Sequence, residues 1–350
     1  MFGTILGALP RPVAGDGGSL ESDDDAVRAA VAAQQGAGLE PVTDGRLRWP
    51  NPLGPLGGLP GITTGVRGDG HGLRATAAPT WEGPLTVANW AFAAGVTRHA
   101  VKQVLPGPFT AGRRIEPGPL GRERLTLGLA EALNAEIAAL TRAGCPLVEI
   151  DEPDVTVIGS DDSERRLFVE AHRRLTGDLS GTHLSLAVTG GNADTAGVGI
   201  FIDAPYASYA FDLIAGPDNW RLVVLIPGDR GIICGALDSR PGSDDSVELL
   251  AWAAHYAAST NGRGLERVGL ATVPGLDGQD WSTVSRKLTR LGKAVGVAGL
   301  SGDAFAASID PRAVDIRSAA LGRYEPGRCR QGHPKPGRTG PGRSKPRGRG

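Results

Sequence analysis

The feature that most constrains the fold is a regular alternation between short apolar runs and longer segments with helical periodicity. Eight runs read as strands, and most are continuously apolar, which is typical of parallel strands buried on both faces. They are Gly3–Ala8, Leu39–Thr43, Val101–Leu105, Leu147–Asp151, His183–Val188, Tyr209–Ile214, Gly231–Asp238 and Val268–Val273. Strands that alternate with helices predict an α/β protein. Eight such units in about 300 residues favour a single (β/α)8 TIM barrel over an open doubly wound sheet.

A ninth run, Leu222–Ile226, is also strand-like and could displace one of its neighbours. Acids in the first turn favour a helix from Asp23, and Ser160 is a suitable N-cap for the helix that follows it. The expected helices are Asp23–Gln35, Gly121–Ala143, Asp161–Leu175, Ser243–Asn261 and Gln279–Val295. Residues 1–300 are therefore predicted to form one barrel domain.

The segment 46–83 is long, rich in Gly and Pro, and without periodicity. A loop of this length in a compact domain is usually functional or partly disordered. Within it, Gly65–Gly72 (GVRGDGHG) follows no strand and opens no helix, so we interpret it as a flexible loop and not as a phosphate-binding loop. Trp49 and Trp81 flank the long loop and could line a pocket or anchor the loop.

The end of the chain differs from the rest in charge. The last 28 residues hold nine Lys or Arg and a single acid, Glu325, whereas the whole chain has a net charge of −1, so the remainder carries −9. Residues 322–350 have few apolar side chains to bury, which predicts a disordered basic tail. Contact with nucleic acid is expected only through this tail, if at all.

The three cysteines, Cys145, Cys234 and Cys329, show no CxxC spacing, and two lie in apolar runs where a buried thiol is the ordinary interpretation. Nothing in their arrangement requires disulfides, which fits a reducing compartment. The sequence has no signal-peptide pattern and no apolar run near the roughly 18 residues of a membrane span. We therefore expect a cytoplasmic protein.

A barrel places its active site at the carboxyl ends of the strands. The fourth predicted strand ends in Asp151 and Glu152, and only one of these neighbours can face the barrel mouth. Asp151 shares a face with Glu149, which favours Asp151, although a carboxylate that caps a loop or a helix is an equal alternative. His183 and Ser185 share one face of the next strand; a lone His there is either a metal ligand or a hydrogen-bonded core residue.

Two further acids lie within or at the end of strands. Asp212 sits in an apolar run and therefore needs a partner or a place at the rim, and the same holds for Asp238. Among the remaining histidines, His172 lies on a helix with several charges and is expected at the surface. His255 lies in an apolar helix, where packing and one hydrogen bond explain it.

Six short motifs, in order over roughly residues 3–298, resemble those of one family. They are ILGALPRP, QQGAGLEPVTDGRLRWPNP, VKQVLPGPFT, AGCPLVEIDEP, THLS and LATVPGLDG. In this order they are similar to motifs of the cobalamin-independent methionine synthases, in the short single-barrel form. The resemblance implies a (β/α)8 barrel that binds homocysteine through zinc and takes a methyl group from a methylated folate.

The resemblance also implies which positions form the site. Asp151, with Glu152 and Ala8, falls where that family holds its amino-acid substrate, and His183 falls on the family's zinc-binding His. The acid ligand corresponds to Asp212, while Ser185 and Pro274 stand where the family has Cys. Serine is a poor zinc ligand at neutral pH, so zinc is a doubtful cofactor.

Other departures point the same way, since Ala8 replaces a Ser of the opening motif and Arg46 replaces the acid of a TDGE motif. Three functions stay open. The chain is a methionine-synthase-like methyltransferase that has lost most of its zinc site, or a non-catalytic barrel that binds a small ligand. A third possibility is a relative of the uroporphyrinogen decarboxylases, for which Arg11 and Arg46 would hold carboxylates.

Overall fold

The computed structural model describes residues 1–13, 20, 22–49, 51–65, 72–243, 245–300 and 302–308. Met1–Ile309 form one compact unit. The basic tail 322–350 and residues 66–71 of the glycine-rich loop lie outside the described residues, so both expectations about them stay predictions.

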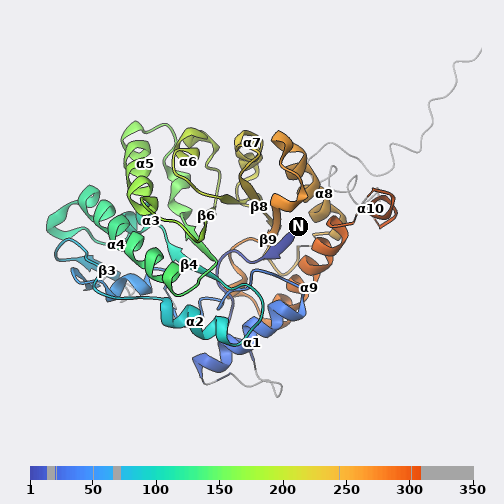
Figure 1. Ribbon diagram of the computed structural model, residues 1–350, viewed down its shortest axis with the longest axis horizontal. Helices are drawn as coiled ribbons and strands as arrows, with labels where there is room; N and C mark the ends of the chain where they lie inside the picture. The colour runs from blue at the N-terminus through green and yellow to red at the C-terminus, as the bar shows by residue number, and fades with distance from the viewer. Residues whose placement is uncertain are drawn as a thin grey trace, which may run out of the picture. The chain divides into compact units, whose positions relative to one another are not determined.

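A curled parallel sheet forms the centre of the molecule (Figure 1). Its seven strands are ordered β1-β9-β8-β7-β6-β5-β4, and every neighbouring pair is parallel. The strands are β1 (Phe2–Thr4), β4 (Lys102–Pro106), β5 (Leu147–Asp151), β6 (His183–Val188), β7 (Ser208–Asp212), β8 (Gly231–Leu237) and β9 (Val268–Thr272). The α/β barrel-type fold expected from the sequence is thus confirmed.

The segment predicted as the second strand, Leu39–Thr43, makes only isolated bridges. Glu40 pairs antiparallel with Gly3 of β1, and Val42 pairs parallel with Val101 beside β4. Pro41, which lies between them, has no N–H group for a ladder of hydrogen bonds. Within the described part of the chain, the sheet therefore has seven strands, and these two bridges span the gap between β1 and β4.

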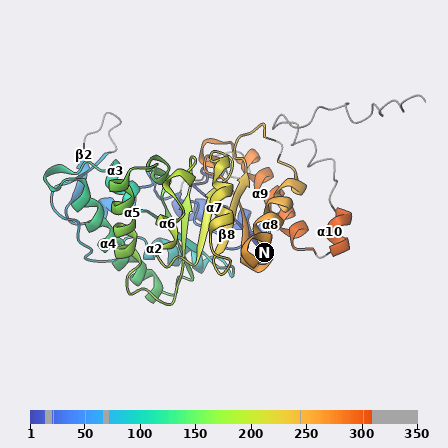
Figure 2. The same ribbon diagram turned by 90° about the horizontal axis from the view of Figure 1, so that it is seen from above.

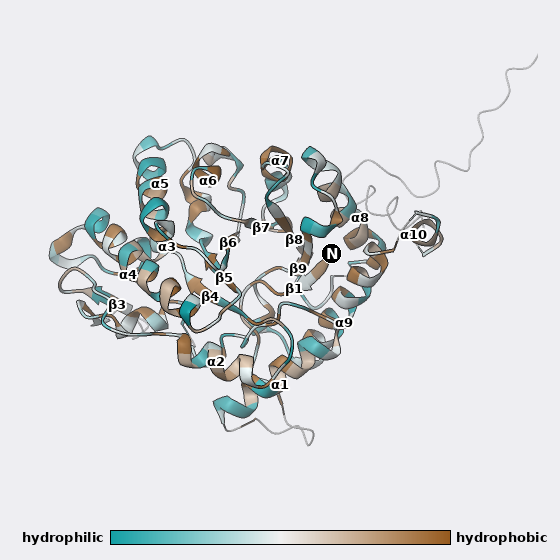
Figure 3. Ribbon diagram, viewed as in Figure 1, coloured by the Kyte–Doolittle hydropathy of each residue, from teal (hydrophilic) through white to brown (hydrophobic). Residues whose placement is uncertain are grey.

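Helices surround the sheet, and Figure 2 shows α5, α6, α7 and α8 following one another along one side. The helices are α1 (Asp23–Gly36), α2 (Val87–Gly95), α3 (Pro108–Arg114), α4 (Arg122–Arg142), α5 (Asp162–Thr176), α6 (Gly199–Ile202), α7 (Trp220–Leu225), α8 (Val247–Ser259), α9 (Trp281–Ala298) and α10 (Gly302–Ser308). Figure 3 shows hydrophilic and hydrophobic residues mixed along α4, α5 and α9, as in amphipathic helices. No helix among the described residues is long and apolar enough to cross a membrane.

Two local predictions need correction. The strand-like run Leu222–Ile226 lies mostly in helix α7, because a short apolar run has no periodicity that separates a strand from a buried helix. The N-cap of α5 is Asp161, whose side chain accepts hydrogen bonds from the N–H groups of Ser163 and Glu164. Ser160, the predicted cap, lies one residue too early.

The long segment 46–83 contains regular structure. It includes a 3-10 helix at Gly54–Gly58 and an antiparallel hairpin of β2 (Ile62–Gly65) and β3 (Gly72–Ala75). Trp81 at its end donates its indole N–H to Glu136 of α4 at 2.9 Å. The anchoring role for Trp81 is therefore the one that the structure supports.

Alternate residues of the strands face two different cores. Outward residues such as Val148 and Phe211 belong to the large core beneath the helices. The inward apolar cluster is small: Leu6, Ala187, Ala210, Ile233 and Ala271. Cys145 and Cys234 are buried free thiols, as expected, and burial raises their pKa values to about 11 and about 12.

Candidate active site at the carboxyl ends of the strands

Asp151 ends β5 and faces the barrel mouth. Its Oδ2 accepts a hydrogen bond from Nη2 of Arg46 at 2.8 Å, and the two side chains are 14% and 13% exposed. Its Oδ1 accepts only a long bond, 3.4 Å, from the hydroxyl of Thr189 at the end of the neighbouring strand. Asp151 is thus an ion-paired carboxylate with one weakly engaged oxygen.

Arg46 reaches the mouth from a tight turn. Its φ is +57°, an uncommon conformation for a residue with a side chain, and its N–H donates to Oδ1 of Asp44 at 2.9 Å. Burial opposes the charge of Arg46, but the acids around it, Asp151 above all and then Glu149 and Asp44, together raise the pKa of the guanidinium. Burial also raises the pKa of Asp44.

A second ion pair lies on the same inward face of β5. Nζ of Lys102 is 2.7 Å from Oε2 of Glu149 and donates to the carbonyl of Ile5 at 2.8 Å. Each of the two charged side chains is 1% exposed. Burial lowers the pKa of Lys102, and Glu149 opposes that shift. The barrel interior therefore carries two acids on β5, each with its own cation.

Glu152 points outward, away from the mouth, and is fully buried. Its carboxylate accepts the N–H groups of Phe109 and Thr110 at the start of α3, at 2.9 and 2.7 Å. It also lies 3.1 Å from Nε2 of His172. A Cβ on Gly107 would fall 2.1 Å from Cδ of Glu152, so only glycine fits there. These contacts tie α3 and α5 to the sheet and leave Glu152 no route to a substrate at the mouth.

The expectation that His172 lies at the surface is wrong. His172 is fully buried, and its Nδ1 is 2.6 Å from the hydroxyl of Tyr206. The charges around it on α5 face solvent, whereas His172 is on the face packed against the sheet. His255, in contrast, packs on Phe305 and makes one hydrogen bond to the carbonyl of Ala298, as expected.

Asp212 and Asp238 end their strands at the mouth and are nearly fully buried. Oδ1 of Asp212 accepts the N–H groups of Ile214 and Ala215, and its Oδ2 accepts that of Gly190 at 3.1 Å. Asp238 is paired with Arg240. The expected partners therefore exist: backbone N–H groups for Asp212, and the backbone N–H and guanidinium of Arg240 for Asp238.

His183 lies at the opposite end of the barrel from Asp212. It is the first residue of β6, six positions before Thr189 at the mouth, which corresponds to roughly 20 Å along a strand. Its Nε2 is 2.8 Å from the hydroxyl of Ser208, the first residue of β7. The structure does not bring His183 and Asp212 together, because His183 is at the amino end of its strand and Asp212 is at the carboxyl end of its own.

The remaining positions of the expected site are also apart. Ser185 is buried inside the barrel, and its hydroxyl has no hydrogen-bond partner among the described residues. Pro274 follows β9 and accepts a hydrogen bond from Ser239. A Cβ on Gly7, which precedes Ala8, would lie 2.9 Å from Cα of Pro274, so Ala8 and Pro274 are on neighbouring segments.

A zinc ion does not fit the donors at this mouth. Zinc in proteins is held by Cys, His and carboxylate ligands, but the described residues contain no group of three or more His, Cys, Asp or Glu that could hold a metal. The mouth offers Asp151, Asp212 and Asp238, which are already engaged by Arg46, by backbone N–H groups and by Arg240. We therefore derive no chemistry through zinc.

Fold and site define an α/β barrel with a polar, ion-paired mouth. Comparisons with known proteins show what the chain is similar to. Residues 74–168, which include Asp151, match the model of the cobalamin-independent synthase catalytic domain. A 5-methyltetrahydropteroyltriglutamate–homocysteine methyltransferase of Nitratidesulfovibrio vulgaris is 32% identical over 139 residues, 37% of this chain and 18% of the relative. The chain thus matches about a fifth of that relative's length.

Two solved structures share the fold. A B12-independent methionine synthase from Shewanella sp. W3-18-1, solved with selenomethionine, is 18% identical and superposes with a TM-score of 0.74 over 84% of this chain and 96% of its own. A methyltransferase from Methanosarcina mazei is 13% identical with a TM-score of 0.51, over 84% and 93%. Part of this chain is therefore similar to the cobalamin-independent methionine synthases, and the two solved structures share its fold.

Sequence reasoning did not find the two ion pairs. Arg46 was considered only as a departure from a motif or as one of two carboxylate-binding arginines, and its partner lies 105 residues away. Arg11, the other arginine of that pair, is bound to Asp23 of α1 at 2.8 Å. The available signal was the pair of acids, Glu149 and Asp151, on one face of a buried strand, because buried acids need cations.

Proposed function

We propose that the carboxyl-end mouth is a methyl-transfer site of the methionine-synthase-like kind, which binds an amino-acid substrate without a protein-bound zinc ion. The Arg46–Asp151 ion pair at the mouth carries this proposal. The family match that includes Asp151 supports it, and so does the likeness to a homocysteine methyltransferase.

The ion pair is complementary to a zwitterion. Oδ1 of Asp151 has only the long bond from Thr189, so it can accept a substrate ammonium. Among the described residues, Asp151 is the only side chain that bonds the guanidinium of Arg46, whose remaining N–H groups can bind a carboxylate. An amino acid presents both groups on one carbon. Homocysteine is therefore the first acceptor to test, and a methylated folate is the first donor.

In the proposed reaction, the carbon–nitrogen bond of the methyl donor breaks as a sulfur–carbon bond forms on the acceptor. The electron pair of the broken bond stays on the donor nitrogen, which takes up a proton from solvent, while the thiol gives up its proton to solvent. The chain's own residues hold the acceptor by its ammonium and carboxylate, which fixes the direction of the thiol. Such positioning converts an encounter between two solutes into a reaction within one complex.

The test is methionine formation from homocysteine and 5-methyltetrahydrofolate by the full chain and two matched variants. Asp151→Asn removes the charge that holds the ammonium. Asp162→Asn is the control, because Asp162 is 77% exposed on α5. Loss of one charged hydrogen bond is expected to lower kcat/KM by about 10- to 100-fold in the first variant. No methionine above background, or equal effects of both variants, would remove the basis for this function.

The second candidate is a barrel that binds an amino acid without turnover. It is favoured by one observation, the lack of any thiolate ligand at the mouth among the described residues. Calorimetric titration with homocysteine and methionine separates the two. Binding that Asp151→Asn removes, in protein that forms no methionine, identifies this second function. The small-molecule partners and the cytoplasmic location stay predictions in either case; two buried free thiols support the latter.

A further inference from the structure

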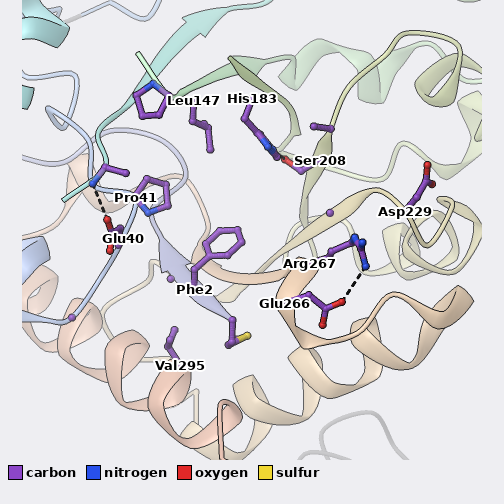
Figure 4. Close-up of a pocket in the computed structure, with 17 residues that line it drawn as sticks. Phe2, Glu40, Pro41, Leu147, His183, Ser208, Asp229, Glu266, Arg267 and Val295 are labelled. Atoms are coloured by element: carbon purple, nitrogen blue, oxygen red, sulfur yellow. Dashed lines mark hydrogen bonds and ion pairs between the residues drawn. The ribbon is translucent and has the colours of Figure 1, made fainter. Parts of the chain in front are cut away.

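A cavity of about 740 Å3 opens at the amino ends of the strands, opposite the mouth. Figure 4 shows side chains from several strands and loops arranged around it. First residues of strands line it, among them Phe2, Leu147, His183 and Ser208, together with Glu40 from the segment that bridges β1 and β4. Its volume falls within the range of roughly 300–1,000 Å3 typical of small-ligand sites.

Small residues leave this end of the barrel hollow. TIM-barrel interiors are normally filled by layers of large branched side chains. Here β8 begins with Gly231, and the cavity is also lined by Gly3, Gly38, Ala100 and Ala207. The ring of Phe2 lies against Gly269, where a Cβ would come within 2.4 Å of it. The cavity is therefore a consequence of sequence, in that glycine and alanine occupy positions where larger side chains would close it.

The polar side chains that line the cavity are mainly acids, together with the hydrogen-bonded pair of His183 and Ser208. The acids that line it are Glu40, Asp229 and Glu266, and Asp229 is paired with Arg230 at 3.8 Å. Glu40 uses one oxygen to accept the N–H of Ala100 at 2.8 Å, and Arg267 is 3.0 Å from Glu266. Among the described residues that line the cavity, Glu40 is thus the carboxylate without an ion pair, which favours a positively charged ligand beside it.

The interior side of the cavity carries unused hydrogen-bonding capacity. His183 and Ser208 bond each other at 2.8 Å, and burial lowers the pKa of His183, which keeps the imidazole neutral near pH 7. Ser185 lies two residues farther along the same face of β6 and is fully buried. Its hydroxyl has no partner in the described part of the chain. Buried hydroxyls normally have a partner, so Ser185 is expected to bond a water inside the barrel, beyond the residues that line the cavity.

We propose that the amino-end cavity is a second binding site, which takes a small organic cation with an apolar body. The ammonium of the ligand meets Glu40, and its apolar body lies against Phe2 and Leu147. The site is independent of the mouth, since roughly 20 Å of strand separates His183 from Thr189.

Calorimetric titration of the full chain with tryptamine tests the proposal, with the uncharged analogue indole-3-ethanol and the anion indole-3-propionate as comparisons. Tryptamine is expected to bind at least tenfold more tightly than indole-3-ethanol, and the anion more weakly still. Glu40→Gln keeps the acceptor for the Ala100 N–H and removes one charge, so it is expected to weaken tryptamine binding about fivefold or more. Asp151→Asn at the mouth is the control and leaves the affinity unchanged.

Three results would overturn the proposal: no tryptamine binding up to millimolar concentration, equal affinity for all three compounds, or binding lost in Asp151→Asn and kept in Glu40→Gln. A cavity-filling variant, Leu147→Trp, gives an independent check. It is expected to abolish tryptamine binding while its circular dichroism spectrum stays that of the parent protein. Unchanged tryptamine affinity in this folded variant also contradicts the proposed site.

Discussion

The buried Lys102–Glu149 pair allows a quantitative test of how the barrel interior is stabilised. At 2.7 Å, two unit charges attract by about 6 kcal/mol at an effective dielectric constant of 20. Desolvation costs several kcal/mol for each ion, so the pair contributes little net stability. Removing one partner is different, because the other charge is then buried without compensation. Glu149→Leu is expected to lower the free energy of unfolding by about 3–5 kcal/mol.

The double variant Lys102→Met/Glu149→Leu is expected to recover most of that loss, since no buried charge remains. Urea unfolding at pH 7, followed by circular dichroism, measures all three proteins. In Glu149→Leu the pKa of Lys102 falls further below its ordinary value. Between the lowered pKa and about 10.4, the folded state therefore binds fewer protons than the unfolded state, and the stability of this variant rises with pH. A single variant that loses less than about 1 kcal/mol, or a double variant less stable than the single, refutes the reasoning.

Three further predictions concern other described residues. Glu152→Leu leaves the N–H groups of Phe109 and Thr110 without their acceptor. The variant is expected to lose about 2–4 kcal/mol of unfolding free energy in urea titrations, and an unchanged urea midpoint would contradict the anchoring role of Glu152. Burial raises the pKa values of Cys145 and Cys234 to about 11 and about 12. Both thiols are therefore expected to resist iodoacetamide until the protein unfolds, which peptide mass spectrometry measures. Rapid labelling of either thiol in the native protein would argue against its burial. Hydrogen bonds from Ser282 and Thr283 lower the pKa of Asp280, the N-cap of α9. The contribution of Asp280 to stability is therefore present above its ordinary pKa and declines as the pH falls through the lowered value. Asp280→Asn should flatten the acid side of the profile of melting temperature against pH, and a profile identical to that of the parent protein would contradict this role of Asp280.

Local patterns predicted most of the sheet. The bounds of β5 and β6 agree with the sequence prediction, because continuous apolar runs flanked by turn residues are strong strand signals. Strand alternation, with Glu149 on the same face, favoured Asp151 over Glu152 at the mouth but did not settle the choice alone. The prediction of the elements was wrong at two places. Pro41 prevents a continuous second strand, and the short run Leu222–Ile226 has no periodicity that marks it as helical.

The candidate site was predictable only in part, since its decisive contacts join distant segments. Nothing near Arg46 in the sequence indicates its bond to Asp151, and nothing near His172 indicates its burial between Glu152 and Tyr206. The motif around His183 was placed at the correct strand, but the position of a residue along a strand decides which end of the barrel it reaches. Pairings of this kind depend on tertiary structure.

The zinc content of protein that forms methionine tests the central claim most directly. We expect methionine-forming protein to carry substoichiometric zinc by mass spectrometry of the metal, and to keep its activity after chelation. Asp151→Asn should lose activity without any change in metal content. One zinc ion per chain that is lost on chelation together with activity, or on His183→Ala or Asp212→Ala, would contradict the account.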